Sequence, residues 1–512
     1  MKKVYAQGIH LLAFVPWESV WQIYAHLLRV KVHLYYNVSN GKFQPYHRIK
    51  NKLTTSNFNQ TFFAVKLKLI GEFVMKEKVL ILGLSKSGIA AAKFANKQGY
   101  EVYITESKSL DKVKEECKSQ VEELKNLGIK IECGYHSDEF ISGAKFAITS
   151  PGIPPKSEIF KRLAEKNTKI ISEIEYAYLN TKIPFIAITG TNGKTTTTAL
   201  VSHILSKDFD APVCGNIGVP PTSLIEGKHD FLVCEISSYQ AQMTEKFKAK
   251  IACWTNFTPD HIDWHGGLEN YFKAKAKIFL PPQEPEYAVL NAQDEKLKEF
   301  AKECKNVVFF DDEKDCKITN NSIFYGDEEI ISLSDCPLVG HHNYQNIMCG
   351  IIIAKLVGMK NEDIRTQIMS FKAPEHRLEK VREMDGITFY NDSKATNPEA
   401  SIVAIDSFNN VDVALILGGR DKNTDLTEMC HSINKHIKTV LLIGEATERF
   451  EENLVKNGFS NIIKERTMED AIDKAISLKP DVVLLSPACA SFDMFNSYEH
   501  RGDVFKTYVL SK

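Results

Sequence analysis

The sequence has no Cys-x-x-Cys pair, and it has no uninterrupted apolar run of the roughly 18 residues that a membrane-spanning helix needs. Its 11 cysteines are scattered and odd in number, which favours reduced thiols over a disulfide framework or a zinc site. It also lacks an excess of charge, with 64 Lys and Arg against 65 Asp and Glu, whereas a general nucleic-acid binder needs a basic field. We therefore expect a cytoplasmic protein with no nucleic-acid partner and no stable membrane insertion.

Residues 1–74 differ from the rest of the chain. They carry ten Lys or Arg and two acidic residues, while the other 438 residues carry 54 basic and 63 acidic ones. The stretch 10–28 is apolar but interrupted by polar residues and a proline, so an amphipathic helix on a membrane surface is one interpretation. Met75 is followed at once by Lys-Glu-Lys and an apolar strand. We therefore interpret residues 1–74 as an atypical basic extension that lies outside the core fold. The other interpretation is that translation starts at Met75.

Beyond Met75, apolar strand-like runs alternate with amphipathic stretches of helix length. This alternation predicts an α/β fold in which parallel sheets are covered by helices. The length of 512 residues allows about three domains of roughly 100–200 residues each. We place them at residues 75–172, 173–373 and 374–512. The predicted strands are 79–82, 101–105, 145–149, 184–189, 230–236, 251–255, 286–290, 387–391, 411–417, 438–443 and 481–486.

The strongest signal is the segment IAITGTNGKTT, residues 186–196, in which an apolar strand enters a glycine-rich turn before a helix. Glycines let backbone N–H groups surround phosphate oxygens. Lys194 then brings a cation to the β- and γ-phosphates, and the Thr195 hydroxyl can bind Mg²⁺. The spacing is two residues shorter than in the usual phosphate loop, because Ile188 stands where that loop has its first glycine. The alternative is a plain glycine turn before a helix.

TGTNGKTTT resembles the ATP-binding loop of the Mur ligase and folylpolyglutamate synthetase superfamily. The resemblance covers nearly all of the chain after residue 74. It implies a Rossmann-like N-terminal domain, a central P-loop-type ATPase domain and a Rossmann-like C-terminal domain. It also implies that ATP phosphorylates a carboxylate and that an amine then displaces the phosphate. The ATP-binding residues that it implies are Gly190, Thr191, Asn192, Gly193, Lys194, Thr195, Thr196, Asn343, Asn346, Arg377 and Asp392.

Three further residues are candidates for binding Mg²⁺. Glu235 ends an apolar strand, where a carboxylate of such a sheet points toward the ligand crevice, although an acid in solvent is the alternative. His261 lies in a segment with two histidines and two aspartates in six residues, and the resemblance makes it the metal-linked histidine. Lys275 lies on a basic amphipathic helix, ordinarily a charged surface. The resemblance implies a carbamate on Lys275, which could bind Mg²⁺ where an ammonium would repel it. The implied metal-binding residues are Thr195, Glu235, His261 and a carbamylated Lys275.

Asn216 lies in a Gly-Asn-Ile-Gly turn and would approach the reacting carboxyl group and the γ-phosphate. The resemblance thus implies four catalytic residues: Lys194, Asn216, His261 and Lys275. The first glycine turn, near Gly83, fails as a dinucleotide fingerprint because Ser85 replaces the second glycine, which argues against an NAD enzyme. The resemblance instead assigns that region to a uridine nucleotide, although Glu106 stands where the family usually has Asp. The UDP-substrate residues that it implies are Lys86, Ser87, Glu106, Ser107 and Asn216.

The segments NDSKATN and SPACASFDMF resemble the D-glutamate-adding members of the family, and the Asp-Asn-Pro-Arg-like motif of diamino-acid-adding members is absent. The resemblance therefore implies a monomer that uses ATP and Mg²⁺ to join D-glutamate to UDP-N-acetylmuramoyl-L-alanine through an acyl phosphate, in peptidoglycan synthesis. Tyr498 is a departure, because the family often has Phe there. The implied D-glutamate-binding residues are Thr396, Lys422, Ser491 and Tyr498.

Three alternatives stay open at this point. The first is another amide ligase of the superfamily, which adds a different amino acid or adds glutamate to folate. The second is a non-catalytic nucleotide-binding scaffold, although a mere binder needs no second metal position beside Lys194 and Glu235. The third is a membrane-attached protein that acts through residues 10–28.

Overall fold

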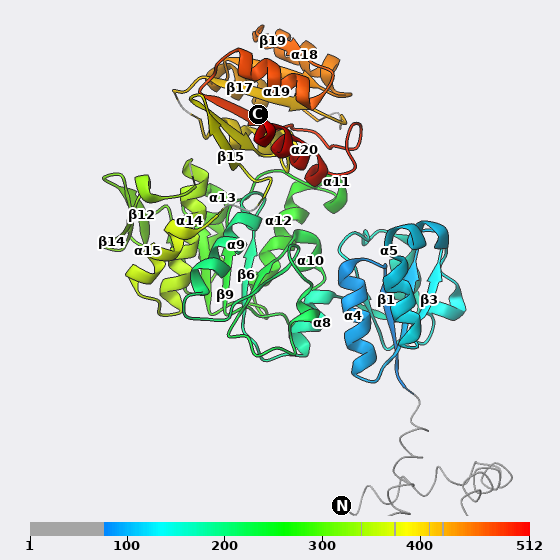
Figure 1. The fold of residues 1–512 in the computed structure, drawn as a ribbon. Coiled ribbons are helices and arrows are strands. Elements are labelled where there is room, and N and C mark those ends of the chain that lie inside the picture. The colour runs from blue at the N-terminus through cyan, green and yellow to red at the C-terminus, as the bar shows by residue number, and fades with distance from the viewer. Residues whose placement is uncertain (1–75, 339, 373–374, 409, 422–423) are drawn as a thin grey trace, which may run out of the picture. The chain divides into compact units, whose positions relative to one another are not determined.

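Three sheets follow one another along the chain, and Figure 1 colours them in chain order from blue to red. The computed structural model describes residues 76–512, apart from positions 339, 373–374, 409 and 422–423. The predictions for residues 1–74, for Met75 and for Lys422 therefore lie outside the described residues. In the described part of the chain, no helix combines the length and hydrophobicity needed to cross a bilayer.

The first sheet is parallel throughout, with strand order β3-β2-β1-β4-β5. Its strands are β1 (Lys78–Leu82), β2 (Glu101–Glu106), β3 (Lys130–Cys133), β4 (Phe146–Thr149) and β5 (Lys169–Ser172). The helices between them are α4 (Lys86–Lys97), α5 (Leu110–Asn126), α6 (Asp138–Ile141) and α7 (Glu158–Glu165). Helix α4 starts where the Ser85 hydroxyl accepts the Gly88 N–H as an N-cap. Gly88 is required there, because a Cβ would lie 2.1 Å from the Gly83 carbonyl oxygen.

The second sheet has nine strands in the order β14-β13-β12-β11-β10-β9-β6-β8-β7. They are β6 (Phe185–Thr189), β7 (Val213–Gly215), β8 (Leu232–Glu235), β9 (Ile251–Trp254), β10 (Tyr287–Asn291), β11 (Val307–Phe310), β12 (Cys316–Thr319), β13 (Ser322–Tyr325) and β14 (Glu328–Ser332). Its α-helices are α8 (Glu173–Leu179), α9 (Lys194–Leu205), α10 (Ser238–Gln242), α11 (Ile262–His265), α12 (Leu268–Ala276), α13 (Glu295–Phe300), α14 (His341–Leu356) and α15 (Asn361–Ser370). Short 3₁₀ turns are η2 (Pro221–Ser223), η3 (Lys277–Phe279), η4 (Ala301–Glu303) and η5 (Leu333–Asp335).

The third sheet has the order β15-β16-β20-β17-β18-β19. Its strands are β15 (Glu379–Met384), β16 (Ile387–Asn391), β17 (Val413–Gly418), β18 (Thr439–Ile443), β19 (Ile462–Lys464) and β20 (Val482–Leu485). Its helices are α16 (Pro398–Ile405), α17 (Thr427–His436), α18 (Thr447–Lys456), α19 (Met468–Ser477) and α20 (Tyr498–Ser511).

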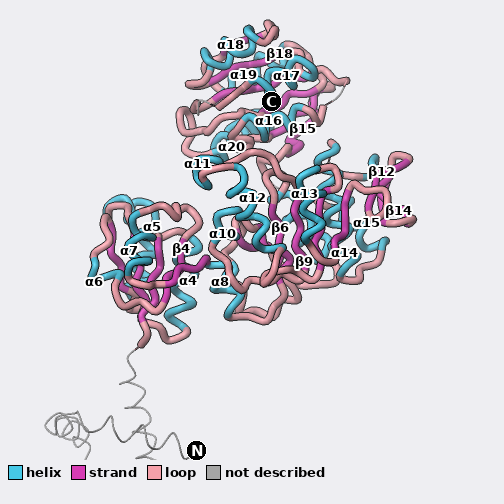
Figure 2. Tube along the Cα trace, turned by 180° about the vertical axis from the view of Figure 1, so that it is seen from behind, coloured by secondary structure: helices cyan, strands magenta, loops and turns pink. Residues whose placement is uncertain are grey.

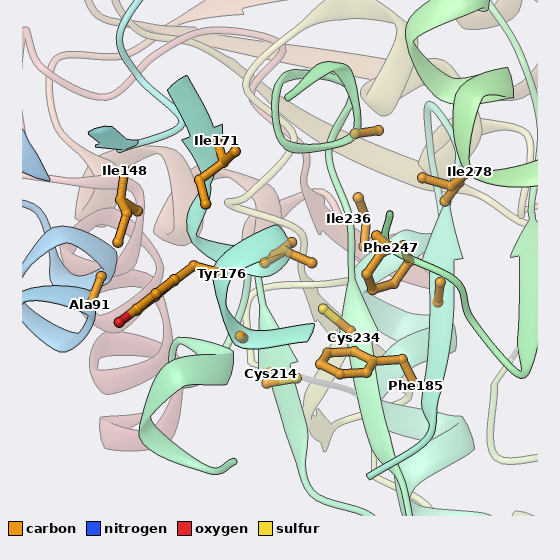
Figure 3. Close-up of a cluster of buried hydrophobic side chains, with 14 of the residues drawn as sticks. Ala91, Ile148, Ile171, Tyr176, Phe185, Cys214, Cys234, Ile236, Phe247 and Ile278 are labelled. Atoms are coloured by element: carbon orange, nitrogen blue, oxygen red, sulfur yellow. The ribbon is translucent and has the colours of Figure 1, made fainter. Parts of the chain in front are cut away.

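Strand β6 shows why its sheet needs helices on both faces, an arrangement visible in Figure 2. Successive side chains of a strand point to opposite faces. Phe185 and Ala187 pack in one buried cluster, while Ile186 and Ile188 pack in another. Figure 3 shows the first cluster, with Cys214 and Cys234 near Phe185. A strand buried on both faces reads as a continuous apolar run, which is why its sequence predicted it.

Each of the eleven predicted strands overlaps a strand of the structure, and the α/β fold is confirmed. The expectation of parallel sheets was incomplete, because β12, β13 and β14 pair antiparallel, as do β15 and β16. Strands β14 and β15 are the edge strands of their sheets and carry charged residues, so their sequences lack the apolar run of a central parallel strand. Strand β16 was predicted, but its antiparallel partner β15 was not. The predicted domain boundaries stay predictions.

Candidate active site

The glycine-rich loop joins β6 to α9 at the carboxyl edge of the central sheet. Gly190 and Gly193 have φ angles of 150° and 80°, which favour glycine. A Cβ on Gly190 would lie 1.9 Å from the Thr255 hydroxyl oxygen, and one on Gly193 would lie 2.6 Å from Asn346 Oδ1. Both glycines thus let neighbouring polar side chains approach the backbone. The N–H groups of Thr191 and Asn192 donate to Asn256, and the loop ends at the start of a twelve-residue helix, where anions are favoured.

Glu235 connects the loop to a second polar segment. Its carboxylate is 1% exposed. One oxygen accepts the Thr195 hydroxyl at 3.0 Å, and the other accepts the Asn216 amide at 2.8 Å. The strand ends of β7 and β8 are paired in register, which brings Asn216 to Glu235. Three residues of the sequence prediction therefore meet around one buried carboxylate.

Two lysines lie beside this carboxylate. Lys194 Nζ donates to the carbonyl oxygens of Gly190 (3.0 Å) and Thr191 (2.7 Å), and Lys275 Nζ donates to Gly190 at 2.6 Å. Burial lowers the pKa of Lys194, and Glu235 opposes that shift. Burial, followed by the charge of Lys194, holds the pKa of Lys275 well below its ordinary value. Lys275 is 1% exposed, so the alternative of a charged surface helix is wrong at this position.

His261 begins α11 with a φ angle of 52°, a left-handed conformation that is uncommon for histidine. Its Nε2 lies 3.2 Å from Asp260 Oδ2, and its ring lies 5.0 Å from the ring of Tyr239. Tyr239 also stacks on His265, whose Nε2 lies 3.0 Å from the Ser238 hydroxyl. Burial, helped by His261 and Lys275, lowers the pKa of His265 to about 4, so this ring is neutral. No group of three or more His, Cys, Asp or Glu in the described residues is arranged to hold a metal by itself.

A pocket opens against the glycine-rich loop. Gly193 and Thr195 line it together with Asn343 and Asn346 of α14. Asn346 holds both elements, because its Oδ1 accepts the Thr197 hydroxyl at 3.0 Å and its amide donates to Asn343 at 3.2 Å. Asn343 and Asn346, which the resemblance implies as ATP-binding residues, thus lie at the phosphate loop itself.

Arg377 and Asp392 line the same pocket. The turn that carries Arg377 is strained, since His376 and Leu378 have φ angles of 62° and 43°. Arg377 Nε is buried and finds no hydrogen-bond partner among the described residues. Burial raises the pKa of Asp392 to about 6, against the opposing effects of Arg377 and a 2.9 Å hydrogen bond from Ser486. The pocket therefore combines a guanidinium, which suits a phosphate, with a carboxyl group.

The predicted uridine residues gather at the carboxyl edge of the first sheet. Glu106 accepts the Leu84 N–H at 2.8 Å and the Lys108 N–H at 3.0 Å, and its other close donor is the Ser107 hydroxyl at 3.2 Å. Burial works against the charge of Glu106, but these hydrogen bonds prevail and lower its pKa. Lys86 and Ser87 begin α4 directly after the turn that Glu106 holds. The four residues are therefore at one edge.

The predicted D-glutamate residues that are described lie on two connections of the third sheet, one after β16 and one from β20 to α20. Thr396 follows β16, Ser491 follows β20 and is 1% exposed, and Tyr498 begins α20. The strand ends are brought together by pairing of β16 and β17 with β20. Burial raises the pKa of Tyr498 to about 12.

Comparison with known families covers all three sheets. A Mur ligase MurD-like N-terminal domain matches residues 77–172, and a Mur ligase middle domain matches residues 188–354. A Mur ligase glutamate ligase domain matches residues 376–489. The chain belongs to the Mur ligase family. The resemblance inferred from the motifs is thereby confirmed.

Several curated relatives of this Mur ligase share one name. The UDP-N-acetylmuramoylalanine–D-glutamate ligase of Caldanaerobacter subterraneus subsp. tengcongensis is 38% identical over 453 residues, which is 85% of this chain and 99% of the relative. That of Koribacter versatilis is 39% identical over 450 residues, and that of Clostridioides difficile 37% over 448, each covering 85% of this chain and 98% of the relative. The crystal structure of UDP-N-acetylmuramate–alanine ligase from Thermotoga maritima matches with a TM-score of 0.54 at 18% identity, covering 85% of this chain and 100% of that one, and it supports the fold.

Four residues of this Mur ligase escaped the sequence analysis. Tyr271 places its hydroxyl 3.1 Å from that of Thr191 in the phosphate loop. Asp260 pairs with His261, and burial lowers the pKa of Lys394 to about 8. Arg501 is 1% exposed and donates to Ser393 and Cys489. Asp260 and Lys394 stood inside quoted motifs, whereas nothing local marks Tyr271 or Arg501, because their partners are distant in sequence.

Proposed function

We propose that this Mur ligase joins D-glutamate to UDP-N-acetylmuramoyl-L-alanine at the expense of ATP, in peptidoglycan synthesis. The observation that carries the proposal is the buried cluster of Lys194, Thr195, Asn216 and Glu235 at the carboxyl edge of β6 and β8. The names of the relatives supply the substrate class. In this proposal the activated group meets the cluster, and the amino acid approaches from the loops after β16 and β20.

The nucleotide would bind in the pocket between the phosphate loop and Arg377. Gly193, Thr195, Asn343 and Asn346 line this pocket. Backbone N–H groups at the start of α9 and the Lys194 ammonium would face the phosphates, and Asn343 and Asn346 would face the base. Asp392 holds the ribose, in keeping with its place on the pocket wall. The positive groups favour transfer of the γ-phosphoryl group to the substrate carboxylate, which forms an acyl phosphate and releases ADP.

The residues present fit Mg²⁺ in part. The Thr195 hydroxyl and the Glu235 carboxylate lie 3.0 Å apart and are oxygen ligands of the kind that Mg²⁺ prefers, with phosphate oxygens completing its shell. When bound, the ion would neutralise phosphate charge. His261 and a carbamate on Lys275 would hold a second ion.

Lys275 is chemically suited to carbamylation. Burial holds its pKa well below the ordinary value, which favours the neutral amine that reacts with CO₂. The nitrogen of the neutral amine would bond to the carbon of CO₂ and lose a proton, which turns a buried amine into a carboxylate-like anion. That anion would also relieve the repulsion between Lys275 and Lys194.

The last step would use the third sheet. Ser491, Thr396, Tyr498 and Lys422 would hold the two carboxylates of D-glutamate, with its amine toward the acyl phosphate. The amine nitrogen bonds to the acyl carbon, phosphate leaves, and the nitrogen gives up a proton to form the amide. Because separate loops would hold the substrates, much of the rate enhancement would come from their alignment. Alignment can lower the activation barrier by roughly 7–11 kcal/mol in favourable cases.

We also propose a monomer in the cytoplasm. All eleven cysteines lie in the described part of the chain, no disulfide links any two of them there, and eight are buried. Such thiols suit a reducing compartment.

ADP release tests the proposal directly. The purified protein is given ATP, Mg²⁺ and UDP-N-acetylmuramoyl-L-alanine, together with D-glutamate, L-glutamate, L-alanine or a diamino acid. We expect release above background with D-glutamate and little with its enantiomer. Equal release with another amino acid, or release that needs no amino acid, would contradict the proposed acceptor.

A further inference from the structure

The turn that carries Asn216 is held from its far end. The turn begins at Gly215, whose N–H donates to the Val219 carbonyl at 3.1 Å. The 3₁₀ turn η2 follows directly, with Thr222 at its centre. The position of η2 therefore fixes where the Asn216 turn ends.

One buried carboxyl group ties η2 down. Oε1 of Glu173 accepts both the Thr222 N–H at 2.7 Å and the Thr222 hydroxyl at 2.6 Å. Glu173 is 3% exposed and Thr222 is 4% exposed, so water does not compete for these hydrogen bonds. From Glu173 the connection runs through Thr222 and the turn to Asn216 and then to Glu235.

Glu173 is poorly satisfied for a purely structural residue. Its Oε2 is buried and has no hydrogen-bond partner among residues that the structure describes. Burial raises its pKa to about 7, although both Thr222 hydrogen bonds oppose the shift. Glu175, two residues later on α8, differs, because its two oxygens accept three N–H groups of residues 245–247. A buried polar atom without a partner is destabilising, so packing alone gives no reason for Glu173.

We propose that Glu173 is a positioning residue: by holding Thr222 it fixes residues 215–223 and so orients the Asn216 amide toward Glu235 and the substrate carboxyl group. Glu173 follows β5 directly, so the same short segment ends the sheet that carries the uridine residues and anchors the turn that meets the reacting end. The inference rests on the proposed function, which places Asn216 at the UDP-linked substrate.

Steady-state ADP release with UDP-N-acetylmuramoyl-L-alanine, ATP and D-glutamate tests this inference. In Glu173→Ala we expect the KM for the UDP-linked substrate to rise about 10- to 100-fold, as for the loss of two buried hydrogen bonds. The KM for ATP should change by less than about twofold, because the phosphate loop keeps its contacts. Glu173→Gln retains an oxygen acceptor and should stay within about threefold of the unmodified protein.

Two further variants keep the test decisive. Thr222→Val removes only the hydroxyl donor and should raise the same KM about three- to tenfold, which serves if Glu173→Ala does not fold. Glu175→Gln is the matched control on the same helix and should leave this KM unchanged. If Glu173→Ala and Thr222→Val leave the KM for the UDP-linked substrate unchanged, or raise the KM for ATP equally, the inference is wrong.

Asn216→Ala separates the two levels of the argument. If it lowers turnover while Glu173→Ala and Thr222→Val do not alter the KM, only the inference fails. If Asn216→Ala itself leaves kcat and the KM unchanged, the role of Asn216 in the proposed function fails, and the inference fails with it.

Discussion

The carboxyl edges of the second and third sheets are built in different ways. At the second, Glu235 and two buried lysines meet a backbone loop, and both lysines donate to the Gly190 carbonyl. At the third, side chains link the loops, because Arg501 bonds Ser393 and Cys489, and Ser393 bonds the Tyr498 carbonyl. The second edge concentrates charge, which suits a polyanion. At the third edge, hydrogen bonds link the loop after β16, the loop after β20 and the start of α20. Substitutions should therefore impair phosphoryl transfer at one edge and loop geometry at the other.

Lys194→Ala should have the largest effect. In the proposed function Lys194 is the cation that faces the phosphates, so its removal should lower kcat by about 10³-fold, in the range found when charge-stabilising groups are lost. The rate of ADP release measures kcat. The control is Lys182→Ala, at an exposed position before β6. Undiminished turnover would contradict the role of this edge.

Lys275→Arg should follow closely. A guanidinium stays protonated and forms no carbamate, so we expect kcat to fall about 10²- to 10³-fold. Labelled bicarbonate should give a carbamate signal in carbon-13 spectra of the unmodified protein and none in the variant. The exposed Lys273→Arg should keep both activity and signal. A signal that persists in Lys275→Arg would assign the carbamate to another lysine.

Arg501→Ala tests the third edge. It leaves the carbonyl groups of Ser393 and Cys489 without their donor and opens a cavity, so we expect the free energy of unfolding to drop by about 2–4 kcal/mol. The KM for D-glutamate should rise more than the KM for ATP. Denaturant titration and kinetics measure both effects, with the exposed Arg466→Ala as control. A variant as stable as the control would mean that Arg501 does not hold the loops together.

Lys394→Met should have the smallest effect, and it should raise the free energy of unfolding, not lower it. Burial lowers the pKa of Lys394 to about 8 from its ordinary 10.5, so below pH 8 the folded state keeps a buried cation at a cost. The unfolded chain binds the extra proton between pH 8 and 10.5, so the unmodified protein recovers stability as pH rises through that window. At pH 7 the variant should be about 1–2 kcal/mol more stable, an advantage that disappears above pH 10.5. Thermal melts at several pH values measure it, with Lys456→Met as control, and a pH-independent difference would exclude titration as the cause.

The strands and the phosphate loop were predictable because their information is local. The apolar run Phe185–Thr189 predicts a buried strand, and the glycines after it predict an anion-binding loop. Neither prediction needs a residue from elsewhere in the chain. Arg501 was not predictable, since its partner Ser393 lies 108 residues away. Likewise, Tyr271 gains its role only where α12 passes the phosphate loop, 80 residues from Thr191. Lys275 was predicted as a magnesium-binding residue only through the resemblance. Its amphipathic helix favoured a charged surface, and its burial shows that this interpretation is wrong at Lys275.

Strand β6 has one more consequence. All five of its residues are fully buried. The side chains of residues 185–188 pack alternately into two hydrophobic clusters. Its amide hydrogens should therefore exchange with deuterium only when the whole domain unfolds. The phosphate loop therefore starts from a strand that stays ordered for as long as the domain is folded.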